Sequence, residues 1–483
     1  MINLILIGCG PHAKRVYLPA IQKMSGVKIS LIVELESQRK VTEKILSRFD
    51  NCEVIYTKPF QNVVPFHLTK ILNKHITQKG VHGVIIATEP MIHKAYAEWA
   101  LKEGLNILLD KPITTRENVV SDINQAKGVL EDYDELLTDY QSLQKSRNTV
   151  FMVNSQRRFH KGFQFVREKI KEVSAITNCP INFIQAYHSD GQWRFPSEIV
   201  TQDYHPYCFG YGKASHSGYH IFDTALEFYK ASTTSKKQAT DFNIYSSFLQ
   251  PHGFFEQFGK DDYNELFKEH TNHQDRWDTE KIYGQCKEFG ELDLSSVITL
   301  KKNGVSIANI NINLVHNGFA GRTWIKPGCD LYKGNGRIKH ESYHIQQGPF
   351  QSIQIHAYQG SDKHDLDNGL EDYLGGKNHF DVYVFRNPLI SNGKPQPTVY
   401  KLTDLFDQHD KEPASNIMME QVKYKVVKEF VDFIVGRISK NEVASQIEDH
   451  RTSVQIMSGV YCSHILAKEE KEPIVNYQLD RLC

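Results

Sequence analysis

The first third of the chain alternates short apolar runs with amphipathic stretches. The runs are rich in Val, Ile and Leu and lack a polar face, which is typical of parallel strands covered on both sides. The amphipathic stretches have helical spacing, so the alternation predicts an α/β domain over residues 1–155. The predicted strands are Asn3–Ile7, Lys28–Val33, Val54–Tyr56, Gly83–Ala87, Asn106–Leu109 and Thr149–Asn154, and the predicted helices are Lys14–Lys23, Ser37–Arg48, Val64–Lys74, Ile92–Glu103 and the long region Glu117–Gln144.

The pattern changes after about Arg158. Apolar and polar positions now alternate with period two, which indicates antiparallel strands with one solvated face. We therefore expect a second, α+β domain over 156–483, with a large, mostly antiparallel open sheet, insertions near 232–283 and 325–413, and C-terminal helices in 416–471 that pack back. Its predicted strands are Pro180–His188, Glu291–Lys301, Val305–Leu314, Ser352–Tyr358 and His379–Phe385, its helices are Phe163–Ser174, Asn416–Ile438 and Thr452–Lys471, and its loops are Ser232–Asp241, Gly253–Asp278 and Gln359–Lys377.

Composition narrows the class of protein. Lys and Arg number 57 and Asp and Glu number 57, so bulk charge would not hold this chain on nucleic acid or on an anionic membrane. No stretch reaches the roughly 18 apolar residues that a spanning helix needs. The eight cysteines are scattered without a Cys-x-x-Cys pair, which favours reduced thiols and gives no sign of a structural zinc site. We expect a cytoplasmic protein with no membrane or nucleic-acid partner.

A glycine-rich turn follows the first strand. Gly8 permits a tight turn, Gly10 lets the backbone approach a pyrophosphate, and Ala13 allows close packing of helix on strand. Glu34 ends the second strand, where a dinucleotide fingerprint has the acid that accepts the ribose hydroxyls. That acid favours NAD(H), whereas the basic residues that follow it keep NADP(H) open. The predicted cofactor contacts here are Gly8, Gly10, Pro11, His12, Ala13 and Glu34.

Two further strand ends carry candidate chemistry. Thr88, Pro90 and His93 follow one apolar run, and Asp110-Lys111-Pro112 follows the next. Ligands bind at the carboxyl ends of parallel strands, so Lys111 is a candidate for cofactor binding and catalysis. An ordinary solvated lysine is the competing interpretation. Thr88, Pro90, His93, Asp110 and Lys111 complete the predicted cofactor contacts.

A dense polar stretch in the second domain includes His216, His220 and Asp223. At the start of a helix these residues can share one face. Oxidation of a secondary alcohol needs a base, for which a histidine is suited, and a nearby lysine stabilises a developing alkoxide. A polar helix start without catalytic function is the alternative, and a metal site on these three residues is a weaker one.

These motifs together resemble the Gfo/Idh/MocA oxidoreductases, the glucose–fructose oxidoreductase and inositol dehydrogenase superfamily. The resemblance implies a Rossmann domain, a C-terminal domain with an open sheet, NAD(H) or NADP(H), sugar or cyclitol substrates, and homodimers or homotetramers that pair through the sheet. It also implies catalytic roles for Lys111 and His220. The motifs that carry it are Gly8-Cys9-Gly10, Glu34, Thr88-x-Pro90-x-x-His93, Asp110-Lys111-Pro112 (where the family usually has Glu-Lys-Pro), Arg158-Phe159, Gly218-x-His220-x-x-Asp223 and the segment after Ser463.

One departure from the family pattern lies at His216, where the family has an aspartate. His216 either replaces the acid as a hydrogen-bond acceptor, or the chemistry is different or lost. We expect an NAD(P)-dependent oxidoreductase acting on CH–OH groups; the alternatives are an epimerase or glycoside-eliminating enzyme that uses transient oxidation, and a non-catalytic nucleotide-binding or scaffold protein. The predicted catalytic residues are Lys111, His220 and His216, and the predicted substrate contacts are Arg158, Lys213, Tyr219, Asp223, Arg322 and Trp324, with no metal.

Overall fold

A computed structural model describes residues 1–46, 52–202, 205–234, 236–266, 279–320, 337–361, 379–394, 396–405 and 418–479. The chain forms two compact units that are interleaved in sequence. Unit 1 contains 1–116, 128–160 and 413–454, and unit 2 contains 117–127, 161–412 and 455–483. Residues 416–471, predicted as helices that pack back, are thus divided between the two units.

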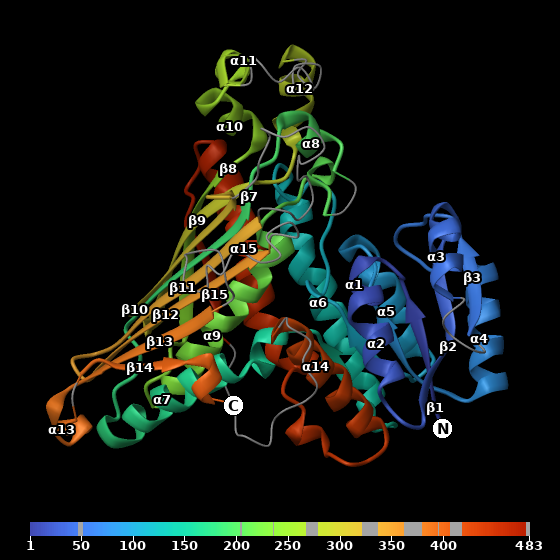
Figure 1. Cartoon of the computed structure of the whole chain (residues 1–483), viewed down its shortest axis with the longest axis horizontal. Coiled ribbons are helices and arrows are strands. Elements are labelled where there is room, and N and C mark those ends of the chain that lie inside the picture. The colour runs from blue at the N-terminus through green and yellow to red at the C-terminus, as the bar shows by residue number, and fades with distance from the viewer. Residues whose placement is uncertain are drawn as a thin grey trace, which may run out of the picture. The chain divides into compact units, whose positions relative to one another are not determined.

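Unit 1 is built on a six-stranded parallel sheet with the strand order β3-β2-β1-β4-β5-β6. Figure 1 labels β1, β2 and β3 of this sheet. This is the Rossmann order, in which successive strands are added on one side of β1 up to β3 and on its other side from β4 onward. In such sheets ligands bind outside the carboxyl ends of the strands, at the point where the order changes side. The apolar strands fit a sheet that is buried on both faces; Leu4, Leu6 and Ile85 belong to one core cluster. The strands are β1 (Ile2–Ile7), β2 (Val27–Leu35), β3 (Glu53–Thr57), β4 (Val81–Ile86), β5 (Asn106–Leu109) and β6 (Phe151–Val153).

The helices of unit 1 follow the predicted periodicity, with one notable difference. The single helix expected over Lys14–Lys23 is two short helices that meet at Val16, whose φ of −120° departs from helical geometry. The helices are α1 (Pro11–Arg15), α2 (Tyr17–Gln22), α3 (Arg39–Leu46), α4 (Phe66–Lys79), α5 (His93–Lys102), α6 (Ile123–Gln144, which enters unit 1 at Gly128) and α14 (Met418–Ile434).

Unit 2 contains a nine-stranded sheet with the order β14-β13-β12-β11-β7-β10-β9-β8-β15 (Figure 1). Its pairs are antiparallel except for β7 and β10, which run parallel. The predicted fold class, a parallel Rossmann sheet plus a large, mostly antiparallel sheet, is confirmed. The strands are β7 (Phe183–Gln192), β8 (Asp241–Leu249), β9 (Asp293–Lys302), β10 (Val305–Asn317), β11 (Arg337–Gln347), β12 (Gln351–Ser361), β13 (His379–Arg386), β14 (Thr398–Lys401) and β15 (Val475–Gln478).

Helices α7 (Lys161–Thr177) and α15 (Arg451–Lys468, in unit 2 from Gln455) agree with the predicted helical segments. Helix α9 (Tyr219–Ser232) begins within the histidine-containing stretch considered above as the start of a helix. The loop predicted over Gly253–Asp278 is wrong in its first part, which forms α10 (Pro251–Gln257) and α11 (Lys260–Leu266). These helices are too short to give a clear period, and they are stabilised by burying Phe255 and Tyr263. The remainder of that loop and most of Gln359–Lys377 lie outside the described residues.

Candidate active site

The glycine turn of unit 1 joins β1 to α1. Gly8 has φ +86°, and a Cβ built on it would lie 2.5 Å from the carbonyl oxygen of Ala87 after β4. Only glycine therefore fits the first position. Gly10 is different, because its φ of −71° suits any residue and a Cβ built there would meet nothing within 4 Å. The space beside Gly10 thus lies open at the start of a helix, where backbone N–H groups attract anions.

Glu34 is bound directly to this turn. Its Oε2 accepts a hydrogen bond from the amide of Cys9 at 2.6 Å, and its Oε1 accepts one from the amide of Leu35 at 2.6 Å. The carboxylate is 8% exposed and so is held rigidly next to the glycines. An ionised carboxylate has about four acceptor sites, so it can still accept the two hydroxyls of a ribose.

Asp110 and Lys111 follow β5 on the same carboxyl edge as the glycine turn. Asp110 Oδ1 accepts hydrogen bonds from the backbone amide of Lys111 at 3.2 Å and from Asn154 Nδ2 at 3.1 Å, and its Oδ2 lies 3.7 Å from His12 Nε2. Burial lowers the pKa of His12 to about 4, although Asp110 opposes this. Burial alone would raise the pKa of Asp110, but His12 and Lys111 bring it below its usual value. Asp110 thus remains ionised beside the cation.

His93 is fully buried at the start of α5 and supports the carboxyl edge of the parallel sheet. Its Nδ1 lies 2.9 Å from the carbonyl oxygen of Pro112, and its Nε2 lies 3.1 Å from that of Thr88. The ring therefore joins the ends of β4 and β5 and supports the segment that carries Lys111. Contact of His93, Thr88, Pro90 and Lys111 with a cofactor stays a prediction.

In unit 2, His216 lies in a π-helical turn, Ala214–Gly218, that leads into α9, which carries His220. π-Helical turns are rare and occur frequently at functional sites. The buried carboxyl of Glu291 accepts hydrogen bonds from the amide of Ala214 at 2.6 Å and from Tyr461 Oη at 3.0 Å. Glu291 therefore fixes the start of the turn, and burial raises its pKa to about 7.

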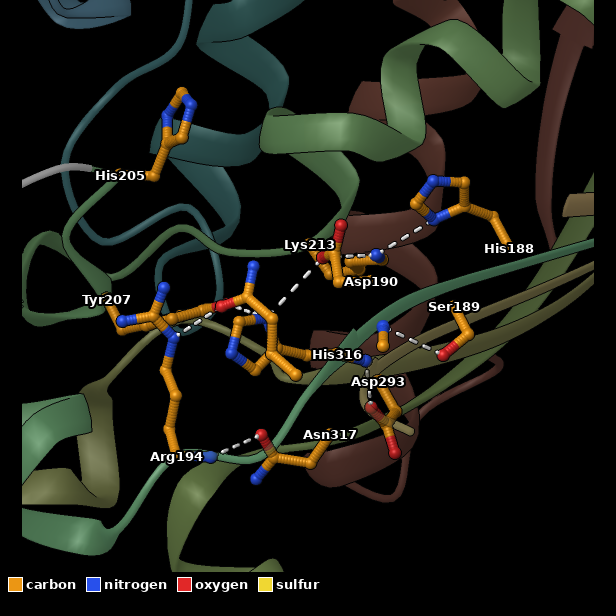
Figure 2. Close-up of polar contacts among 12 residues, drawn as sticks. His188, Ser189, Asp190, Arg194, His205, Tyr207, Lys213, Asp293, His316 and Asn317 are labelled. Carbon is orange, nitrogen blue, oxygen red and sulfur yellow. Dashed lines mark hydrogen bonds and ion pairs between the residues drawn. The ribbon is translucent and has the colours of Figure 1, made fainter. Parts of the chain in front are cut away.

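Lys213 precedes this turn and is fully buried. Its Nζ lies 2.5 Å from Asp190 Oδ2 and 3.0 Å from His188 Nδ1, both on β7 (Figure 2). Arg337 Nη2 holds the other oxygen of Asp190 at 2.7 Å. Burial alone would raise the pKa of Asp190, but Lys213 and then His316 and Arg337 hold it well below its usual value. Lys213 thus joins the sheet to the π-helical turn Ala214–Gly218, which carries His216 and is called the candidate catalytic turn below.

The remaining predicted substrate contacts lie in several places. Tyr219 and Asp223 are buried on α9 in unit 2. Arg158 belongs to unit 1, where its Nη1 donates to the carbonyl of Ala444 at 3.1 Å and lies 3.3 Å from Asp449 Oδ2. Arg322 and Trp324 lie outside the described residues. Lys111 belongs to unit 1, and His216 and His220 to unit 2, so their action on one substrate stays a prediction.

The sequence pattern assigns no role to Asp190, Tyr207 or Glu291. In the structure each of them contacts Lys213 or a residue of the π-helical turn Ala214–Gly218. One signal was available for Asp190. It lies two positions after His188 on a strand, and alternate positions share a face. No comparable signal marks Tyr207, which follows a loop, or Glu291, which precedes β9.

Within the described ranges, no group of three or more His, Cys, Asp or Glu side chains could hold a metal ion. In the same part of the chain, none of the helices combines the length and apolar character needed to cross a membrane.

Comparison with known proteins adds to this geometry. Residues 2–138 match the family model described as "Oxidoreductase family, NAD-binding Rossmann fold" (GFO_IDH_MocA). The predicted resemblance is confirmed. The N-terminal part of the chain is therefore a Rossmann domain of an NAD-binding oxidoreductase family. No curated protein sequence matches the chain.

Solved structures share the fold over both units. An oxidoreductase from Agrobacterium radiobacter, in complex with NAD+, L-tartaric acid and magnesium, has a TM-score of 0.56 at 14% identity, covering 99% of this chain and 98% of that one. A putative myo-inositol dehydrogenase from Sinorhizobium meliloti 1021 has 0.55 at 11%, covering 99% and 100%. The 3-ketoreductase KijD10 from Actinomadura kijaniata, in complex with NADP and TDP-benzene, has 0.53 at 12%, covering 95% and 96%. At these identities the likeness concerns the fold.

Proposed function

We propose that this protein is an NAD(P)-dependent oxidoreductase that transfers a hydride between nicotinamide and a CH–OH carbon of a sugar, cyclitol or related compound. The observation that carries the proposal is the glycine turn with Glu34 bound to it. Gly8 is required by the fold, whereas Gly10 leaves open the space that a pyrophosphate would take. Two proteins of similar fold, the putative myo-inositol dehydrogenase and the 3-ketoreductase KijD10, motivate the choice of substrate class.

The residues present fit a dinucleotide. The amides at the start of α1 would bind the pyrophosphate, and Glu34 would accept the ribose hydroxyls. A bound nicotinamide supplies the hydride acceptor or donor. We infer that NAD(H) is favoured over NADP(H), because the carboxylate of Glu34 would repel a 2′-phosphate.

Residues of the chain itself then transfer the proton of the substrate hydroxyl. Lys111 orients and polarises the reacting oxygen, and the carboxylate of Asp110 stabilises the positive charge of Lys111. His220 takes the hydroxyl proton during oxidation and returns it during reduction. In place of the family's aspartate, His216 serves as a hydrogen-bond acceptor for the substrate. Glu291 and Lys213 position the turn that carries His216.

The experiment is a titration of the full chain with NADH and NADPH, followed by turnover assays with myo-inositol and D-glucose in which nicotinamide absorbance is recorded. We expect binding of NADH in the micromolar range and a change in absorbance with at least one of these polyols. Lys111→Met should reduce turnover at least a hundredfold even at saturating nucleotide, since general acid–base groups contribute about 10²–10⁴-fold.

A matched control is Lys102→Met at the end of α5, which removes a lysine from unit 1 without touching the carboxyl edge of the sheet. This variant should behave as wild type in both assays. Substrate turnover without a net change in absorbance would instead support the epimerase or elimination reaction. Absence of binding of both nucleotides would refute the proposal.

We further propose that two copies pair through the open face of the nine-stranded sheet. Tyr245 and Val297 lie opposite each other on β8 and β9 and are 48% and 42% exposed. Exposed apolar side chains that adjoin on a sheet favour burial against another protein surface. Light scattering should give a dimer or tetramer, and Val297→Glu should lower that mass toward a monomer; an unchanged mass would contradict the assignment.

A further inference from the structure

His316 near the end of β10 belongs to a buried polar cluster in unit 2. Its side chain is 3% exposed, and its Nδ1 lies 2.7 Å from Tyr207 Oη and 3.5 Å from Asp190 Oδ2. Its backbone amide donates to Asp293 Oδ1 at 2.8 Å. Figure 2 shows these partners around the ring. The imidazole is thus held from its backbone and through one ring nitrogen.

The other ring nitrogen of His316 is not satisfied. Nε2 is buried and has no hydrogen-bond partner among the residues that the structure describes. A buried polar group without a partner loses its hydrogen bonds to water and gains none in the protein, so native proteins rarely leave one without a reason. Burial lowers the pKa of His316 to about 4, which keeps the ring neutral near pH 7.

The neutral ring limits what can satisfy Nε2. If Tyr207 donates to Nδ1, then Nε2 carries a proton and needs an acceptor. If Nδ1 carries the proton and faces the ionised Asp190, then Nε2 needs a donor. A hydroxyl group can donate or accept and so suits either tautomer. A ligand carboxylate suits only the first, and it would also be repelled by Asp190.

The cluster adjoins the candidate catalytic turn. The ring of Tyr207 packs edge-on against His316, with centroids 5.3 Å apart, and edge-on against His216, with centroids 5.4 Å apart. One aromatic side chain therefore separates the unsatisfied imidazole from the histidine that stands where the family has its aspartate. A ligand that binds beside His216 would therefore lie one aromatic ring away from His316.

We propose that His316 is a substrate-recognition residue whose Nε2 binds one hydroxyl group of a polyhydroxylated ring compound, with Asp190 and Tyr207 fixing the orientation of the imidazole. This inference rests on the proposed function and adds the contact that selects one hydroxyl other than the reacting one. Lys213 acts through Asp190 and is a positioning residue in this arrangement.

The test measures binding of D-glucose, myo-inositol and their monodeoxy derivatives to the full chain by calorimetry, with and without saturating NADH. In wild type, removal of one particular hydroxyl should weaken binding at least tenfold. His316→Phe should bind the parent compound as weakly as wild type binds that deoxy compound, and should no longer distinguish the two. A merely structural role would weaken all compounds equally.

The matched control is His464→Phe. His464 is another imidazole of unit 2 with a buried Nε2 that lacks a partner among the described residues, but it stacks on Phe248 instead. This variant should keep the wild-type preference. If His316→Phe does not fold, His316→Gln serves as the second variant. A separate measurement is the ¹⁵N resonance of His316 Nε2 in histidine-labelled wild type, which should shift on saturation with the parent compound.

Three results would overturn the inference. The first is an unchanged deoxy penalty in a folded His316 variant, and the second is an Nε2 resonance that does not move at saturation, as expected if only a buried water occupies the site. The third is binding of NADH without binding of either polyol. All three leave nucleotide binding by unit 1 intact. Failure of both NADH and NADPH to bind refutes the proposed function, while the titrations without nucleotide still test His316.

Discussion

Loss of the buried Lys213–Asp190 ion pair should destabilise unit 2 strongly, and the cost should depend on which of the two residues is replaced. Removal of one partner of a buried pair typically costs about 3–5 kcal/mol, because the other charge is left uncompensated. After Lys213→Met, Asp190 keeps Arg337 at 2.7 Å, so we expect about 3 kcal/mol. After Asp190→Asn, the fully buried Lys213 faces an amide instead of a carboxylate and keeps His188 at 3.0 Å, so we expect about 5 kcal/mol.

The double variant should cost less than the sum of the two, because neither charge of the buried pair then remains without its partner. Arg337 also loses Asp190, but its side chain is 27% exposed and reaches water. Hydrogen exchange of β7 amides is the suitable assay, since a chain of two units need not unfold in one step. Lys471→Met, which removes the exposed partner of Glu469, is the control and should leave β7 unaffected. Additive losses, or a larger loss for Lys213→Met than for Asp190→Asn, would refute this account of the cluster.

Three further predictions concern the cofactor site and pH. Gly10→Ala should leave the melting temperature unchanged and weaken NADH binding at least tenfold. The control Gly26→Ala lies at φ +77° in open space, so it should cost about 1 kcal/mol of stability and leave NADH binding unchanged. Equal NADH binding by both variants would contradict the assigned role of Gly10. Glu34→Ser should raise the affinity for NADPH relative to NADH at least tenfold, measured by fluorescence titration, and an unaltered ratio would remove Glu34 from cofactor selection. Burial lowers the pKa of His464 to about 4. Between about pH 6.5 and 4 the unfolded chain therefore binds a proton at His464 that the folded chain does not bind, and the free energy of unfolding falls as the pH drops. His464→Phe should make the fall in melting temperature over this range shallower, and an identical slope would exclude that contribution.

The parts of the site that depend on local sequence could be predicted. The turn at Gly8, the acid at Glu34 and the lysine after β5 each lie at a strand end, and the order of strands and helices determines which edge of a parallel sheet they share. The geometry added a distinction between two glycines that look equivalent in the sequence. Gly8 is required by the carbonyl of Ala87, whereas Gly10 has free space around it.

The second unit was harder to predict because its strands are less regular in pattern. Strand β11, Arg337–Gln347, is mostly polar and lies within a segment expected to be an insertion, yet it pairs along its length with β12 and along most of it with β7. Its stability comes from backbone hydrogen bonds and from buried Tyr343 and Ile345 rather than from an apolar face. Asp241–Leu249 was not predicted as a strand, although it alternates buried and exposed positions.

The buried cluster illustrates what sequence spacing cannot reveal. Asp190 and His316 come from β7 and β10, whose parallel pairing brings positions more than a hundred residues apart next to each other. Lys213 reaches them from a loop. No periodicity within one element encodes such a contact, because it depends on the register between strands and on the path of the chain between them.

Dinucleotide binding by the glycine turn and Glu34 is best measured by titrating the full chain with NADH. We expect saturable binding in the micromolar range at one site per chain, weakened at least tenfold by Gly10→Ala in a protein that melts at the wild-type temperature. Absence of saturable binding of both NADH and NADPH to the folded wild-type chain would contradict this expectation.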